Sequence, residues 1–305
     1  MKPAPFTYFA PQSVSEALAL LREHGEGAKI LAGGQSLVPL MNFRLVRPHV
    51  LIDINGLSEL ASLAVSDGGV TAGALVRQWE LERSSEVARR LPILSEAIRF
   101  VGHPAIRNRG TVGGSLVHAD PAAELPVVAM ALDAEFQLQS AQGSRSLAAR
   151  EFYTGYLSTA IASDELLVKI HLPFSPPNTG WCFTEIARRQ GDFALVAVAL
   201  LLGFNGDGSV SFARIALGGI GGAPVRAGTA EESLLGKRPS ETLFREAAQV
   251  AAQGLEPEND IHASAAYRRH IAEVLVRRAL ETARTRSGSL SGFGFEASMR
   301  KDRDV

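Results

Sequence analysis

The sequence of 305 residues contains a single cysteine, Cys182. One thiol can form neither an internal disulfide nor, by itself, a zinc site or an iron–sulfur cluster, because each of these needs several ligands. If electrons pass through such clusters, the clusters therefore belong to another chain. Cys182 itself, next to Trp181, is interpreted as a small buried side chain and not as a point of covalent cofactor attachment.

An excess of charge of either sign is also lacking. The chain has 31 Lys and Arg residues against 32 Asp and Glu residues, and no basic or acidic block supports binding to nucleic acid or to a membrane surface. The first residues, MKPAPFTYFAPQ, lack the apolar stretch of a signal peptide. The longest apolar run, residues 193–204, is shorter than the ~20 residues that cross a bilayer. These features predict a cytoplasmic protein with no membrane insertion.

The chain can form a large core, since 46% of its residues are hydrophobic. Its length suggests two domains. Ser13 and Glu16 predict a capping box that opens a helix ending at Gly25. Residues 75–100 are expected to be mostly helical, with a break at Pro92. Short strands are predicted at residues 28–32, 49–54, 69–75, 134–140 and 164–173.

Proline and glycine cluster at residues 173–180, which indicates a domain boundary. Beyond it the pattern predicts antiparallel strands, two of them joined by a hairpin at residues 205–208, and then helices at 241–253 and 263–284. The glycine run at 218–224 has no helix pattern after it and is interpreted as a structural loop. Residues 289–305 are expected to form a flexible tail.

Two similar turns stand almost eighty positions apart, LAGGQSL at residues 31–37 and TVGGSL at 111–116. Each glycine pair lets backbone N–H groups approach an anion without a Cβ in the way, and Lys29 is a nearby cation. Neither turn fits the Rossmann or P-loop pattern. Either turn alone is as easily explained as a tight structural turn, but two turns facing each other could clamp a dinucleotide diphosphate.

The second turn lies in residues 106–126, which we expect to form a long loop. Asp120 is expected to cap a helix whose first residue is Pro121. Arg107 and Arg109 could attract a phosphate or a partner subunit, or lie in a solvated loop. Arg188 and Arg189 offer similar alternatives.

The stretches LAGGQSLVPLMNFRLVRPHVLIDI and GHPAIRNRGTVGGSLVHADPAAELP resemble the two FAD-binding motifs of the flavoprotein (medium) subunit of molybdenum hydroxylases. This family includes aerobic carbon-monoxide dehydrogenase and is related to the flavin domain of xanthine dehydrogenase. RRQGDFALVAVAL and DIHASAAYRRHIAEVLVRRAL resemble parts of the same subunit's C-terminal domain.

The resemblance implies an α+β fold in two domains. The first, residues 1–176, would be a two-part FAD-binding region of the vanillyl-alcohol-oxidase type, with subdomains at about 1–55 and 56–176. The second, residues 177–288, would be an α+β domain with an antiparallel sheet and helices.

The resemblance also implies the contacts of a non-covalently bound FAD. They are Lys29, Leu31, Ala32, Gly33, Gly34, Gln35, Ser36 and Leu37 in the first motif, Thr111, Gly113, Gly114, Ser115, His118, Asp120 and Glu124 in the second, and Val168 and Phe193 beyond them. Glu124 stands where much of the family has Asp, Ser115 where Asn is common, and Phe193 where an aromatic residue covers the flavin in some relatives. We predict no catalytic acid or base and no metal site in this chain.

The implied function is that of an oxidoreductase subunit in a heterotrimer that pairs into a dimer of trimers. A large subunit would hold molybdopterin and hydroxylate the substrate, and a small subunit with [2Fe–2S] clusters would pass electrons to FAD here and on to an external acceptor. One alternative is a stand-alone FAD oxidase or dehydrogenase of the same flavin fold, although no acid–base residues stand out for it. Another is a non-catalytic protein that has lost FAD, against which the intact glycines argue.

Overall fold

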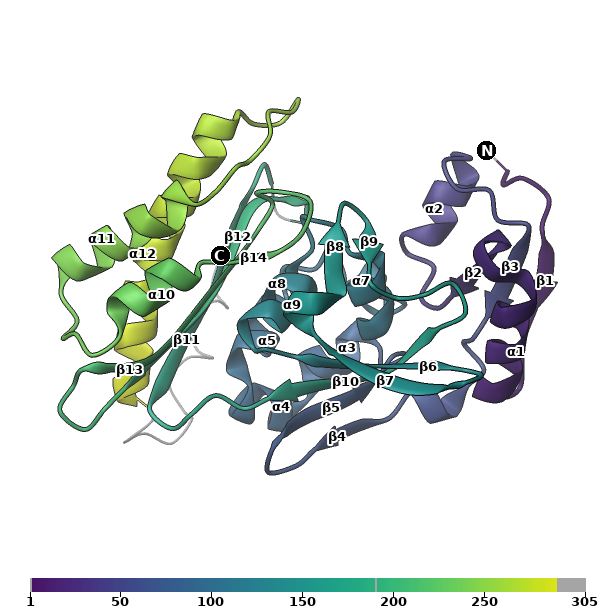
Figure 1. The fold of residues 1–305 in the computed structure, drawn as a ribbon, viewed down its shortest axis with the longest axis horizontal. Coiled ribbons are helices and arrows are strands. Elements are labelled where there is room, and N and C mark those ends of the chain that lie inside the picture. The colour runs from purple at the N-terminus through teal and green to yellow at the C-terminus, as the bar shows by residue number, and fades with distance from the viewer. Residues whose placement is uncertain (1, 190, 290–305) are drawn as a thin grey trace, which may run out of the picture.

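The structure is a computed structural model that describes residues 2–189 and 191–289. Three larger β-sheets follow one another along the chain and lie in a row, from the N-terminal sheet at the right of Figure 1 to the C-terminal sheet at its left. Helices pack between and beside them, which confirms the predicted α+β class. Among the helices that the structure describes, none combines the length and apolar character of a membrane span.

The N-terminal sheet is small and parallel, with strand order β1-β3-β2. Its elements are β1 (Thr7–Phe9), α1 (Val14–His24), β2 (Ala28–Leu31), α2 (Leu37–Asn42) and β3 (Val50–Asp53), with a 3₁₀ turn at Gly25–Gly27. The predicted helix is present as α1, whose first turn is capped by the Ser13 side chain. The Glu16 carboxylate accepts from the Gln12 N–H instead of the Ser13 N–H, so the capping box is displaced by one residue. Gly25 ends the helix with a φ of 48°, which glycine adopts without strain.

The central sheet is antiparallel, with strand order β4-β5-β10-β6-β7. Its strands are β4 (Leu63–Val65), β5 (Gly69–Gly73), β6 (Glu135–Ser140), β7 (Gly143–Ala148) and β10 (Leu166–Pro173), and a 3₁₀ turn at Ser58–Leu60 precedes them. The helices beside it are α3 (Gln78–Arg83), α4 (Ser85–Arg90), α5 (Pro92–Ala97), α6 (Pro104–Arg107), α7 (Val112–His118), α8 (Glu124–Ala131) and α9 (Ala149–Phe152). A small hairpin of β8 (Tyr153–Gly155) and β9 (Ser158–Thr159) follows α9. The expected helical stretch with a break at Pro92 is therefore confirmed.

The prediction of one long loop over residues 106–126 was wrong, because α7 runs through the glycine pair. Thr111 is extended and its hydroxyl accepts the Gly114 N–H at 3.0 Å, which makes it an N-cap that compensates for two poor helix formers. The expected cap at Asp120 was also wrong. Asp120 accepts the Ala122 N–H at 2.9 Å in a turn, and the next helix begins only at Glu124.

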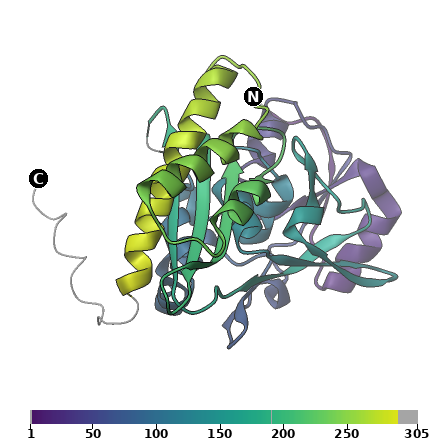
Figure 2. The same cartoon turned by 60° about the vertical axis from the view of Figure 1, so that its left-hand side comes forward.

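The C-terminal sheet is antiparallel, with strand order β11-β12-β13-β14, and three helices cover one of its faces (Figure 2). The strands are β11 (Thr179–Ala187), β12 (Ala194–Phe204), β13 (Val210–Gly218) and β14 (Val225–Arg226), and the helices are α10 (Gly228–Leu234), α11 (Glu241–Gln253) and α12 (Ala265–Ser289). The predicted hairpin at residues 205–208 joins β12 to β13. Two helices were expected here, so α10 was missed. A flexible tail was expected at residues 289–305. Ser289 is instead the last residue of α12, and residues 290–305 lie outside the described residues.

The apolar run of β12 is explained by burial on both of its faces. Val196, Val198, Leu200 and Leu202 join the core under the helices. Ala197, Ala199 and Leu201 instead join the core shared with the central sheet. The sheets thus occupy residues 7–53, 63–173 and 179–226, while the domain limits at residues 55 and 176 stay a prediction.

Candidate functional site

The first glycine turn follows β2 and leads into α2. Within the described residues, no hydrogen bond takes the backbone N–H groups of Gly33, Gly34, Gln35 or Ser36. Gly34 has a φ of 70°, which turns the chain where most residues would be strained. Four neighbouring N–H groups without partners in a turn are the donors from which backbone anion sites are made.

The second glycine turn differs, because its N–H groups already have partners. Gly113 donates to the Ala74 carbonyl at 3.0 Å, Gly114 donates to the Thr111 hydroxyl, and Ser115 donates to the Thr111 carbonyl at 3.1 Å. A Cβ on Gly113 would lie 2.6 Å from that of Ala74, so glycine is needed there for packing. The side that this turn can present to a ligand is therefore made of side chains, among them the Ser115 hydroxyl, and not of free amides.

The structure brings the two turns into direct contact. A Cβ built on Gly33 would lie 2.5 Å from the Arg109 carbonyl oxygen and 2.8 Å from the Cα of Gly110. Where a Cβ on Gly114 would stand, the Ala32 side chain is 3.9 Å away. Two segments almost eighty positions apart thus share one surface, at a separation that only glycine at position 33 permits.

Two residues outside both motifs bridge this contact, and sequence reasoning missed them. The Asn55 side-chain N–H₂ donates to the Ala32 carbonyl at 2.7 Å, and its oxygen accepts from the Arg77 guanidinium at 2.7 Å. Arg77 also donates to the Arg109 carbonyl. The only signal for Asn55 was its position just after a buried strand, and Arg77 had none.

The charged residues near the second motif have distinct roles. Arg107 is 7% exposed, forms a two-point ion pair with Glu82 and donates to the Val101 carbonyl. It is therefore a structural residue, and neither the phosphate nor the partner interpretation holds for it. The side chain of Arg109, by contrast, is exposed.

Two carboxyl groups, one on α8 and one on β11, have raised pKa values. Burial, with a smaller contribution from the charge of Asp120 and against the opposing charge of Arg107, raises the pKa of Glu124, which is 7% exposed, to about 7. Burial and the charge of Glu124 raise the pKa of Glu185 to about 8. One Glu185 oxygen is buried with no hydrogen-bond partner in the described structure. At neutral pH this pair therefore retains a proton, and Glu124 is not the purely accepting carboxylate that the sequence suggested.

The remaining predicted contacts are spread around this centre. Lys29 is exposed on β2, and Leu31 and Leu37 flank the first turn. His118 ends α7, with Asp120 just beyond it.

Phe193 is 71% exposed at the end of the loop before β12. A Cβ on Gly191 in that loop would lie 2.4 Å from the His103 ring. Gly191 therefore lies against His103 of the second motif.

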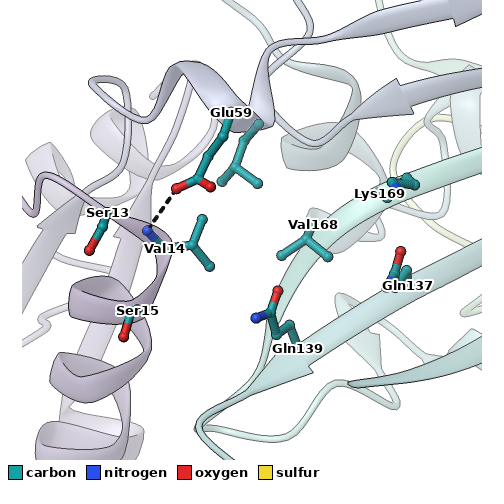
Figure 3. A pocket seen from close by; sticks show the side chains of 9 residues that line it. Ser13, Val14, Ser15, Glu59, Gln137, Gln139, Val168 and Lys169 are labelled. Atoms are coloured by element: carbon teal, nitrogen blue, oxygen red, sulfur yellow. Dashed lines mark hydrogen bonds between the residues drawn. The ribbon is translucent and has the colours of Figure 1, made fainter. Parts of the chain in front are cut away.

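Val168 is the exception, because it lines a separate cavity of ≈ 440 Å³ between α1 and the central sheet (Figure 3). The other lining residues are Ser13, Val14, Ser15, Glu59, Leu60, Gln137, Gln139 and Lys169. None of the other predicted contacts is among them. The contact of Val168 with the cofactor stays a prediction.

Cys182 is buried, as expected, and burial raises the pKa of its thiol to about 11. A neutral buried thiol is a poor nucleophile. Across the part of the chain that the structure describes, no group of three or more His, Cys, Asp or Glu side chains is arranged to hold a metal ion.

Comparisons with known proteins match both halves of the chain. Residues 4–175 match the model of the FAD binding domain in molybdopterin dehydrogenase, and residues 181–283 match that of the CO dehydrogenase flavoprotein C-terminal domain. The chain is 44% identical over 283 residues to the 6-hydroxypseudooxynicotine dehydrogenase complex subunit alpha of Paenarthrobacter nicotinovorans, covering 93% of this chain and 96% of that one.

Two solved structures superpose closely. One is a carbon monoxide dehydrogenase from Hydrogenophaga pseudoflava that lacks the Mo-pyranopterin moiety of its molybdenum cofactor, with a TM-score of 0.91, 38% identity, and coverage of 94% of this chain and 99% of that chain. The other is quinoline 2-oxidoreductase from Pseudomonas putida 86, with a TM-score of 0.88, 40% identity, and coverage of 93% and 99%.

Proposed function

Because the chain belongs to the family of flavoprotein subunits of molybdopterin dehydrogenases, we propose that it is the FAD-carrying electron-transfer subunit of a heterotrimeric molybdenum hydroxylase. One observation carries the proposal. The first glycine turn has four N–H groups without a hydrogen-bond partner among the described residues, and it packs directly on the backbone of the second motif. A dinucleotide diphosphate has the charge and the size that such a joint surface accommodates.

The residues present fit FAD in different ways at the two turns. The N–H groups of residues 33–36 would donate to the diphosphate oxygens, with the Ser36 hydroxyl and the Lys29 ammonium close by in the chain. At the second motif, Ser115 would donate through its hydroxyl, because the neighbouring amides are already taken. The remaining contacts that we propose are Leu31, Ala32, Leu37, Thr111, Gly113, Gly114, His118, Asp120, Glu124, Val168 and Phe193.

Bound FAD would supply the redox chemistry, since a flavin accepts electrons from one donor and releases them to another. The work of this chain is to hold the cofactor by its diphosphate. FAD would be held without a covalent bond, because the thiol of Cys182 is buried and its pKa is raised to about 11.

The partners follow from the family and from the cysteine content. A small subunit with [2Fe–2S] clusters would deliver electrons, because a chain with one cysteine cannot ligate such a cluster alone. A large subunit with molybdopterin would carry out the hydroxylation, and an external acceptor would take the electrons from FAD. We propose that two such trimers associate in the cytoplasm, and that residues 1–176 form the FAD-binding domain and 177–288 the C-terminal domain.

The test is to isolate the tagged full-length chain from its native host. We expect a cysteine-rich chain and a molybdopterin-containing chain to co-purify with it, together with a flavin absorbance that acid precipitation releases into solution. Turnover of an organic substrate by the lone chain would favour the stand-alone oxidase or dehydrogenase. A complex free of flavin would favour the non-catalytic alternative.

A further inference from the structure

The contact between the two turns is held by a chain of hydrogen bonds that starts outside both of them. Asp53, the last residue of β3, accepts from the Asn55 backbone N–H at 2.9 Å and from its side-chain N–H₂ at 2.7 Å. The other Asp53 oxygen accepts the Tyr8 hydroxyl at 2.7 Å. Burial alone would raise the pKa of Asp53, but the Tyr8 and Asn55 hydrogen bonds outweigh it, so the pKa is lowered and Asp53 stays an acceptor.

These contacts determine which way the Asn55 amide points. Its nitrogen donates to Asp53 and to the Ala32 carbonyl, and its oxygen accepts from Arg77. The opposite orientation would bring the amide oxygen against two acceptors and the amide N–H₂ against a cation. Asn55 thus reaches from β3 to the residue that immediately precedes the first glycine pair.

Arg77 extends the bridge to the second motif. Its guanidinium donates to Asn55 and to the carbonyl of Arg109, the same carbonyl that stands against Gly33. The Arg77 backbone also forms a β-bridge with Thr111, the cap of α7. The carbonyls of Ala32 and Arg109, one from each motif, are therefore connected through two side chains.

The geometry points to Asn55 and Arg77 as positioning residues for FAD, which fix the direction of the first-turn amides and the spacing of the two motifs. A trans peptide directs its C=O and N–H groups to opposite sides. With the Ala32 carbonyl held by Asn55, the Gly33 N–H points away from Asn55, toward the side that the diphosphate would occupy. This inference rests on the proposed function and names residues that act through others and do not touch the cofactor.

The test compares three variants of the full-length chain, purified with its partners. Asn55→Asp replaces one N–H₂ by oxygen, so the acceptor for Arg77 remains and the donor to Ala32 is lost. Arg77→Lys keeps the charge but cannot span both acceptors as a planar fork does. Asn178→Asp is the matched control, because it adds the same charge at an exposed residue outside both motifs.

We expect FAD to bind about tenfold or more weakly to Asn55→Asp and to Arg77→Lys, with the control within about twofold of wild type. A second readout is hydrogen exchange of the peptide that spans residues 32–38. Saturating FAD should protect it in the wild type and the control, and clearly less in the two variants. Reduced protection at saturation that is confined to this peptide reports misdirected amides, because a general loss of stability would raise exchange in other peptides as well.

Equal FAD affinity and equal protection in all four proteins would overturn the inference and leave the proposed function intact. Equal weakening by Asn178→Asp would also overturn it, because the added charge alone would then explain the effect. If Asn55→Asp does not fold, Arg77→Lys decides. A wild-type complex that binds no FAD would instead refute the proposed function.

Discussion

Gly33 and Arg109 touch through their backbones, at a distance that leaves no room for a side chain. A Cβ on residue 33 would stand 2.5 Å from the Arg109 carbonyl oxygen, a contact that real Cβ atoms essentially never make. The two motifs are therefore parts of one surface. Because glycine has no Cβ, the backbones of the two turns can approach this closely at position 33.

Gly33→Ala should accordingly weaken FAD binding about tenfold or more, because the added methyl group must push the two turns apart. Flavin content and the dissociation constant of FAD measure the effect. Gly221→Ala is the matched control, since a Cβ there has open space and the backbone is not left-handed. FAD affinity of Gly33→Ala equal to that of the control would show that the contact does not shape the site.

Arg286 of α12 connects the C-terminal helix to α5. It forms a two-point ion pair with Glu96 at 2.8 and 2.9 Å, and the same Glu96 accepts the Phe183 N–H of β11. Arg286→Met should lower the free energy of unfolding by about 1–3 kcal/mol, because the Glu96 carboxylate loses its main partner. Urea titration compares it with Arg284→Met, an exposed arginine on the same helix. Equal unfolding midpoints would contradict the prediction.

Glu231 in α10 is a buried acceptor for two elements. Its carboxylate takes two hydrogen bonds from Arg226 and one from the Ile215 N–H, each at 2.7 Å. We expect Glu231→Gln to cost about 1–3 kcal/mol of unfolding free energy, since the partly buried Arg226 loses one of its two carboxylate partners and keeps only Asp133. The neighbouring exposed Glu232→Gln should cost less than about 0.5 kcal/mol. Thermal unfolding of the two variants makes the comparison, and similar losses in both would contradict it.

The pair of Glu124 and Glu185 predicts a dependence of stability on pH. The pKa of Glu185 rises from 4.5 to about 8 on folding, and that of Glu124 to about 7. The native state therefore binds more protons than the unfolded chain between pH 4.5 and 8, so these groups lower the free energy of unfolding as the pH rises through that window.

Glu185→Gln removes one of these titrations. The variant should gain at least about 1 kcal/mol relative to wild type between pH 5 and pH 8.5. Urea titrations at both pH values measure the gain, with the exposed Glu246→Gln as control. A difference between variant and wild type that does not change with pH would refute the prediction.

Local patterns were sufficient for elements whose signals lie within a few residues. The cap at Ser13 and the stop at Gly25 delimit α1, Pro92 starts α5 after a break, and the turn at 205–208 joins two strands. Helix α10 could not be predicted in the same way. It starts at a glycine and is held by Glu231, whose partners Arg226 and Ile215 lie outside the helix.

The candidate site, too, could be predicted only where its signal lies within a few residues. The glycine pairs were recognisable because close backbone approach requires glycine, whatever surrounds it. Whether their amides are free was not recognisable, since the N–H groups of Gly113 and Gly114 are taken by Ala74 and by the Thr111 cap.

The amino-acid sequence by itself determined the α+β class, the two glycine turns and the family, because each rests on spacings of a few residues or on motifs that are contiguous in the chain. Only the tertiary structure decided that Gly33 meets Arg109, that Asn55 and Arg77 bridge them, and that Glu185 approaches Glu124. Those relationships join residues from different strands and helices. Packing of the sheets and helices sets their distances, and local propensity carries no information about that packing.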